Sequence, residues 1–182
     1  MNNPNLTALS WKMLEYGRSA RAYFYGENYY EAADTATVGY SVFLPYTMSL
    51  VNNCPGIEYA GSSLVLESST SIRNYFALYP GENISNYEFW VTAEDGSNPQ
   101  AVGPVPLANG YCIQISNIPP NMYDRMYLIN AHKIGTPYTQ TLTLRYGVYS
   151  YAEKAFSKTA NYRLQALMRA MYMYNQAAKR VF

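Results

Sequence analysis

Four aromatic side chains in the middle of the chain are candidates for binding a sugar. They are Tyr75, Tyr79, Tyr87 and Trp90. We expect them on neighbouring strands, where alternate residues share a face, so that their rings form a platform for pyranose rings. Nearby amides would supply polar contacts, namely those of Asn74, Asn86 and Gln114. The alternative is that the same rings form cross-strand pairs in the protein core.

The single histidine, His132, is the residue that a serine hydrolase triad would have to use. No G-x-S-x-G motif accompanies it, so we expect His132 at a strand end or on the surface, and we expect no catalytic residues. The sequence has neither a P-loop nor a dinucleotide fingerprint. One histidine and two distant cysteines also lack the spacing of transition-metal ligands, so we expect no metal and no other cofactor.

Acidic residues give two further candidate sites. Glu67 lies opposite Arg73 in a predicted hairpin, and we expect the two to form a structural ion pair. A glycoside hydrolase would need two carboxyl groups facing each other across a cleft, which makes such an enzyme a distant alternative. The segment 94–98, EDGSN, lacks the full pattern of a calcium-binding loop and is predicted to be a turn.

Two cysteines, Cys54 and Cys112, are too few for a disulfide framework. In a secreted protein they form either one disulfide bond or two free thiols. A disulfide bond would close a long loop and stabilise the fold by about 4 kcal/mol on the chain-entropy account. The sequence leaves both states open.

The candidate residues must be positioned by a fold with a helix at each end. An N-terminal helix over residues 6–25 is predicted, capped by Asn5 or Thr7 and ended by Gly26. Gly17 costs this helix about 1 kcal/mol relative to alanine, so we expect it to mark a close contact. The side chains expected to point inward are those of Trp11, Leu14, Tyr16, Ala20 and Tyr23.

C-terminal helices are predicted over residues 148–181. Apolar residues in the last of them recur at steps of three and four from Leu164 to Val181, which is typical of a helix with a buried face. Segments 16–24 and 174–182 share the pattern Y-x-x-[SA]-A-x-x-[YV]-F. Its small residues allow a close approach, so we expect the terminal helices to pack together or side by side on one sheet.

The middle of the chain, residues 40–146, alternates β-branched and aromatic residues with polar ones between recurring turn residues. Strands are predicted at 40–44, 57–60, 63–68, 71–79, 87–93, 111–115, 123–132 and 138–146. No crossover helix separates them, so they should be antiparallel. We predict one α+β domain, residues 1–182, with an antiparallel sheet or β-sandwich of about seven or eight strands packed with the terminal helices.

The composition argues against two classes of partner, nucleic acids and membranes. Charged residues make up 14% of the 182 residues, the net charge is +1, and no run of Lys or Arg occurs. Nucleic-acid binding therefore lacks its electrostatic signature. No apolar stretch approaches the roughly 20 residues that span a bilayer, so we expect no membrane insertion.

Four segments, in this order, resemble a module that recurs in secreted and cell-surface proteins of Gram-positive gut anaerobes. They are MLEYGRSARAYFYG, GSSLVLESSTSIRNYF, RYGVYSYAEKAF and RAMYMYNQAAKRVF. In such proteins the module accompanies leucine-rich repeats, carbohydrate-active regions or dockerin-type segments. The two cysteines and the insert QAVGPVPLANG depart from the usual pattern of this module.

The resemblance implies an extracellular or cell-surface module without a catalytic role. We therefore expect a non-catalytic accessory module, a spacer or an interaction domain, whose partners are neighbouring modules of a larger protein. The alternative is a carbohydrate-binding module that uses the aromatic platform, with polysaccharide as its partner. A spacer would bury its aromatic side chains, whereas a binding module must expose them.

Overall fold

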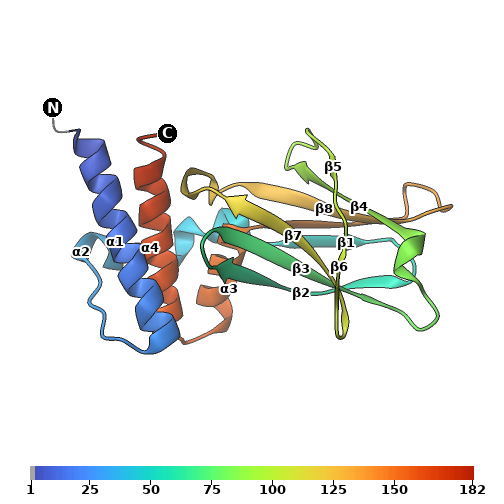
Figure 1. The fold of residues 1–182 in the computed structure, drawn as a ribbon, viewed down its shortest axis with the longest axis horizontal. Helices are drawn as coiled ribbons and strands as arrows, with labels where there is room; N and C mark the ends of the chain where they lie inside the picture. Colours follow the sequence, from blue (N-terminus) through green and yellow to red (C-terminus); the bar gives the residue numbers. More distant parts are fainter. Residues whose placement is uncertain (1–2) are drawn as a thin grey trace. The chain divides into compact units, whose positions relative to one another are not determined.

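The structure, a computed structural model, describes residues 3–182 (Figure 1). Within this range it contains four α-helices towards the two ends of the chain and nine strands in two antiparallel sheets. The predicted α+β class, a β-sandwich with N- and C-terminal helices, is confirmed.

The chain divides into two compact units. The helical unit comprises the chain up to Thr47 together with Pro119–Asp124 and Ala152–Phe182, and the sandwich unit comprises Met48–Ile118 and Arg125–Tyr151. That the chain is one domain stays a prediction. The helical elements are α1 (Pro4–Tyr25), α2 (Ala33–Ala36), η1 (Tyr40–Val42), η2 (Leu44–Tyr46), η3 (Ile84–Asn86), η4 (Pro120–Met122), α3 (Val148–Lys158) and α4 (Tyr162–Ala178).

The N-terminal helix, α1, starts slightly earlier than predicted because a different residue caps it. The side chain of Asn3, and not that of Asn5 or Thr7, accepts a hydrogen bond, from the amide of Asn5 at 3.0 Å. A proline follows in the first turn, where its missing N–H costs nothing. Gly26 ends the helix as predicted, at a φ of 73° in the left-handed region.

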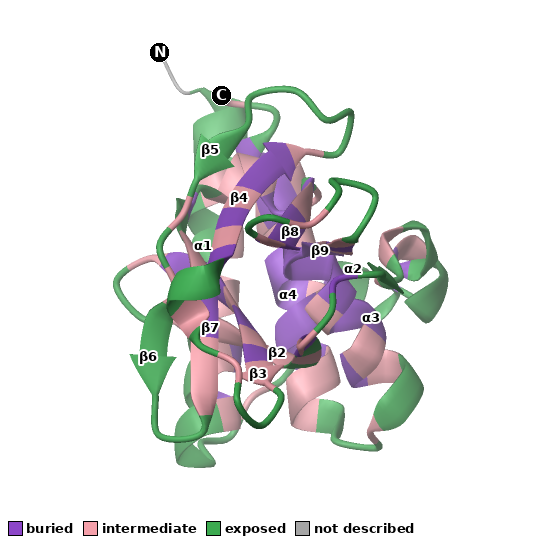
Figure 2. Ribbon diagram, turned by 90° about the vertical axis from the view of Figure 1, so that its right-hand side faces the viewer, coloured by how far each residue is buried: buried purple, intermediate pink, exposed green. Residues whose placement is uncertain are grey.

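The predicted packing of the two terminal helices is confirmed. Tyr16 of α1 stacks on Tyr174 of α4, with ring centroids 5.6 Å apart and planes inclined by 16°. Leu167 and Met171, in the middle of α4, are fully buried, and Figure 2 shows this part of the helix in purple. The periodic apolar residues of the C-terminal segment therefore form core, as their spacing indicated.

The inward face of α1 agrees with the predicted one only in part. Tyr16 packs on α4 as expected, and Ala20 and Tyr23 are partly buried. Trp11 and Leu14, expected to point inward, are 63% and 50% exposed. The buried residues of α1 are Ser19 and Ala22, which are small enough for another helix to approach closely and leave the larger side chains outside. Nothing lies within 4 Å of a Cβ built at Gly17, so the predicted close contact there is wrong.

The strand predicted at 40–44 is also wrong. The segment forms the short 3₁₀ helices η1 and η2, the second of which contains a proline that would break a strand ladder. Between them the ring of Phe43 is fully buried and lies 5.3 Å from that of Phe156. Phe43 thus belongs to the core of the helical unit, whereas Leu44 is 49% exposed.

An ion-pair cluster joins α1 to α2. The Lys12 ammonium lies 2.8 Å from a carboxylate oxygen of Glu15 and 2.8 Å from one of Asp34. The hydrogen bond from Lys12 lowers the pKa of Asp34 against an opposing effect of burial. Burial raises the pKa of Glu15, but hydrogen bonds from Lys12 and Thr35 outweigh it and the net pKa is lowered.

These lowered pKa values predict a loss of stability in acid. A carboxyl whose folded pKa lies below its unfolded value, about 4, contributes its full stability above that value and loses it as the pH falls through the folded pKa. We expect the urea midpoint of the protein to fall between pH 5 and pH 2. The fall should be smaller in Asp34→Asn, and an identical pH profile for the two proteins would contradict the role of this cluster.

The sandwich unit contains both sheets. Its strands are β1 (Ser49–Asn52), β2 (Ile57–Leu66), β3 (Thr70–Leu78), β4 (Tyr87–Ala93), β5 (Gln100–Ala101), β6 (Val105–Leu107), β7 (Gly110–Ile118), β8 (Met126–Lys133) and β9 (Thr141–Gly147). The five-stranded sheet has the order β1-β9-β8-β4-β5, and the four-stranded sheet has the order β2-β3-β7-β6.

Apart from the one at 40–44, the predicted strands are present, with two differences. The strands predicted at 57–60 and 63–68 are one strand, β2, whose register shifts between Tyr59 and Gly61. The short strands β1, β5 and β6 were not predicted. The hairpin of β2 and β3 is confirmed, with Leu64 opposite Ile72.

Apolar side chains from both sheets form the core of the sandwich unit. The ring of Phe76 in β3 lies 5.8 Å from that of Phe89 in β4, so aromatic contacts connect the two sheets. Cys54 and Cys112 are buried free thiols, and burial raises the pKa of each.

Candidate functional site

The outer face of the five-stranded sheet carries the polar side chains of the sandwich unit that are best placed for binding. Along β4, alternation puts Glu88 and Trp90 on this face and Phe89 on the buried one. The register places Glu88 opposite His132 of β8. Two adjacent strands therefore bring a carboxylate, an imidazole and an indole together.

His132 is buried, at 3% exposure, and both of its ring nitrogens are engaged. Nδ1 lies 2.9 Å from Oε1 of Glu88, and Nε2 lies 3.0 Å from the carbonyl oxygen of Thr136. The ring of Tyr138 stacks on the imidazole with centroids 4.3 Å apart and planes inclined by 14°. His132 therefore lies at the end of β8, as one of the two predicted alternatives has it, but it is not on the surface, because the loop after β8 folds back over the ring.

The contacts of His132 hold Glu88 in place. The imidazole fixes one carboxylate oxygen, while the Glu88 side chain remains 43% exposed. A hydrogen bond to the same carboxylate raises the pKa of the Tyr138 hydroxyl. An oriented carboxylate with accessible lone pairs is a strong acceptor for hydroxyl groups of a ligand.

A pocket of about 360 Å³ opens over this group. Its lining residues are Glu88, Phe89, Trp90, Pro99, Ala101 and Tyr138. Tyr138 is 70% exposed and Trp90 is half-buried, so both aromatic side chains are accessible to solvent. We call this site the Trp90 pocket.

Of the four aromatic residues predicted to form a platform, only Trp90 lines this pocket. Tyr75 lies in β3, a strand of the other sheet, and its hydroxyl is 2.7 Å from Oγ of Ser63. Tyr87 faces the core, where its hydroxyl donates to the carbonyl of Pro55. Tyr79 is exposed just beyond the end of β3. The prediction that the four share one face is therefore wrong.

The predicted polar contacts are dispersed as well. Asn74 is fully buried in β3, and Gln114 lies in the four-stranded sheet, where it accepts a hydrogen bond from Arg73. Asn86 is exposed at the end of η3, outside the Trp90 pocket. None of the three amides belongs to the lining of that pocket.

The predicted ion pair between Glu67 and Arg73 is not among the ion pairs of residues 3–182. The register explains this. Arg73 lies opposite Ser63, and its Nε donates to Oε1 of Gln114 at 2.8 Å, whereas Glu67 lies in the turn beyond the last pair of the hairpin.

Segment 94–98 forms a turn, as predicted. The Gly96 amide donates to the carbonyl of Ala93, and the carboxylate of Asp95 accepts from the amide of Ser97 at 2.9 Å. From residue 3 to residue 182, no group of three or more His, Cys, Asp or Glu side chains is arranged to hold a metal ion.

Of the lining residues of the Trp90 pocket, sequence reasoning found Trp90 but missed the two other side chains that the site depends on, Glu88 and Tyr138. Glu88 could have been found, since it is two positions from Trp90 in a strand whose bounds were predicted correctly. The same alternation would have placed Tyr87 on the opposite face. Tyr138 carries a weaker signal, the Gly135 and Pro137 turn that follows His132, because such a turn predicts a reversal but not what it covers.

Comparison with known protein families, curated proteins and solved structures finds no match for this chain. Among the described residues, no helix has the length and apolar character needed to cross a membrane.

Proposed function

We propose that the chain is a non-catalytic accessory module of an extracellular modular protein and that its sandwich unit binds a glycan in the Trp90 pocket. The proposal rests on one observation. Two accessible aromatic side chains, Trp90 and Tyr138, line the same pocket as an oriented carboxylate, that of Glu88. The extracellular setting and the neighbouring modules are part of the proposal and are supported by the resemblance alone.

The chemistry of the pocket suits a pyranose ring. Such a ring has an apolar C–H face, which packs on an aromatic side chain, and a rim of hydroxyl groups, which donate to a carboxylate. Because His132 already orients Glu88, little conformational freedom of that side chain is lost when a ligand binds. This arrangement favours binding over a spacer role.

The same geometry favours binding over hydrolysis. Glycoside hydrolysis uses two carboxyl groups across the scissile bond, and within residues 3–182 Glu88 is the one carboxylate among those that line this pocket. The buried His132 has hydrogen-bond partners at both nitrogens, which leaves neither positioned to act on a ligand as a general base.

Trp90→Ala is expected to weaken glycan binding by about 30-fold, because truncating a central aromatic residue of a binding site costs roughly 2 kcal/mol. The measurement is the dissociation constant for soluble oligosaccharides after a screen of plant and host polysaccharides. Tyr138→Ala should also weaken binding, since it removes the second ring and uncovers His132.

The matched control is Tyr25→Ala, which removes a 79% exposed tyrosine from the helical unit and should leave binding unchanged. Equal affinity of Trp90→Ala and the unaltered protein would place glycan binding elsewhere. Lack of binding to every polysaccharide of the panel would leave the spacer function in its place.

A further inference from the structure

A second cavity of the sandwich unit has a different chemical character. It has a volume of about 400 Å³ and lies between the ends of β4 and β8, the β4–β5 connection, and β7. This volume lies within the roughly 300–1,000 Å³ of small-molecule sites, so a ligand of one or two rings would fit. We call it the Arg125 cavity.

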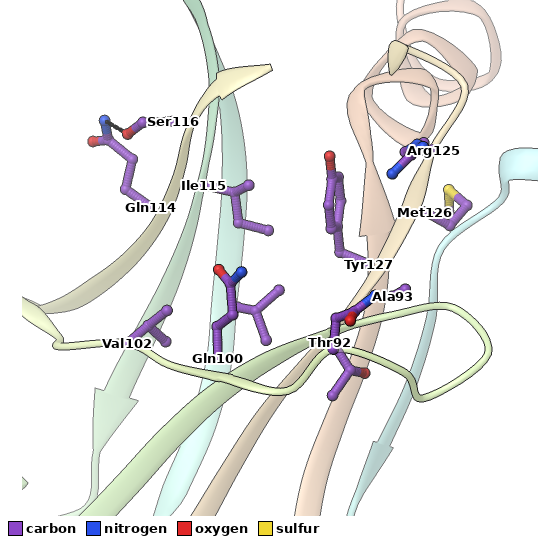
Figure 3. A pocket seen from close by; sticks show the side chains of 12 residues that line it. Thr92, Ala93, Gln100, Val102, Gln114, Ile115, Ser116, Arg125, Met126 and Tyr127 are labelled. Carbon is purple, nitrogen blue, oxygen red and sulfur yellow. Dashed lines mark hydrogen bonds between the residues drawn. The ribbon is translucent and has the colours of Figure 1, made fainter. Parts of the chain in front are cut away.

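The walls of the Arg125 cavity come from both sheets (Figure 3). Ile115 of β7 and Tyr127 of β8 lie on opposite sides of it, and Gln100 of β5 lies below Ile115 in this view. Gln114 and Ser116, which are hydrogen-bonded to each other at 2.8 Å, lie on the other side of β7. The ligand space is therefore bounded by an aliphatic side chain, a phenol and an amide.

The lining of the Arg125 cavity carries a net positive charge. Arg125 is the single charged side chain among its lining residues, and it takes part in none of the ion pairs formed by residues 3–182. The residue is exposed, so its guanidinium stands at the rim, where it can meet an incoming ligand. A fixed positive charge with no acidic neighbour in the lining favours an anion.

Tyr127, close to Arg125, supplies a hydroxyl group to the same cavity. Burial raises the pKa of the Tyr127 hydroxyl, and the charge of Arg125 acts in the opposite direction. The hydroxyl therefore remains protonated at neutral pH and can donate or accept a hydrogen bond beside the guanidinium. A ligand with a carboxylate next to hydroxyl groups would match both side chains.

We propose that the Arg125 cavity binds a carboxylate-bearing sugar, with the guanidinium of Arg125 on the carboxylate and the side chains of Tyr127 and Gln100 on the hydroxyl groups. The planar guanidinium matches a carboxylate through two parallel hydrogen bonds. Apolar side chains such as Val102 and Ile115 line the remaining walls and would pack on the C–H groups of the ring. One arginine without a second cation suits a monoanion better than a phosphate dianion.

The test is a calorimetric titration of the whole chain with glucuronate and galacturonate, with glucose and inorganic phosphate as comparison ligands. We expect saturable binding of at least one uronate, about tenfold or more tighter than that of glucose or phosphate. Arg125→Gln should weaken uronate binding about tenfold or more, whereas Arg18→Gln, an exposed arginine of the helical unit, should not. Gln100→Ala is a second variant, at an exposed position, and should weaken binding as well.

Several results would overturn the proposal. They are equal binding of glucose and the uronates, phosphate binding as tight as uronate binding, an unchanged uronate affinity in both Arg125→Gln and Gln100→Ala, and no saturable binding of either uronate. The site is independent of the Trp90 pocket, so the two proposals fail separately. Trp90→Ala should retain uronate binding, and Arg125→Gln should retain binding of a neutral glycan.

Discussion

Leu167→Ala is expected to lower the free energy of unfolding by about 2–5 kcal/mol, the range for removing a leucine side chain from a packed core. Leu167 is fully buried in the middle of α4, on the helix that packs against α1 through the stacked rings of Tyr16 and Tyr174. The measurement is urea denaturation followed by the circular dichroism of the helices.

The chain offers a matched control in Leu14→Ala. Leu14 lies on α1 but is 50% exposed, so its truncation should change the free energy of unfolding by only about 0.5 kcal/mol. Similar losses for both variants would mean that α1 and α4 do not pack with Leu167 inside and Leu14 outside. A large loss for Leu14→Ala alone would restore the inward face that the sequence predicts for α1.

Where the sequence predicted the fold well, the signal was local. The β-strand 87–93 and the hairpin around residues 67–69 follow from alternation and turn residues that lie within a few positions of one another. The C-terminal helix follows from a long 3.6-residue period. Such patterns depend only on residues that are close together along the chain, and these can be read directly from a single sequence.

The predictions that failed depended on contacts between distant segments. Tyr75 lies in β3 and Trp90 in β4, which follow each other in the chain. The two strands nevertheless belong to different sheets. No local pattern records which sheet a strand joins. The short strands β1, β5 and β6 pair with longer ones at sheet edges, and their two to four residues are too few to show alternation.

The burial of His132 depends on tertiary contacts in the same way. A histidine near a strand end is usually solvated, but here Tyr138 covers its ring and Glu88 of the adjacent strand meets its Nδ1. The ring is therefore a support for the Trp90 pocket. His132, Glu88 and Tyr138 are visible in the sequence, but the loop conformation that brings them together is not.

Phe76→Ala is expected to lower the free energy of unfolding by about 3–5 kcal/mol, because it removes a buried ring that meets Phe89 of the other sheet. Its matched control is Tyr75→Ala, the adjacent residue on the opposite face of β3. That variant loses a half-exposed ring and one hydrogen bond to Ser63, and should cost no more than about 1.5 kcal/mol.

The readout for this pair is urea denaturation followed by tyrosine and tryptophan fluorescence, alongside the circular dichroism used for Leu167→Ala. If the chain unfolds as one domain, Phe76→Ala and Leu167→Ala must shift the same transition in both signals. If the helical and sandwich units unfold separately, each substitution will shift its own transition and leave the other in place. Equal losses for Phe76→Ala and Tyr75→Ala would contradict the placement of Phe76 on the inner face of β3 and of Tyr75 on its outer face.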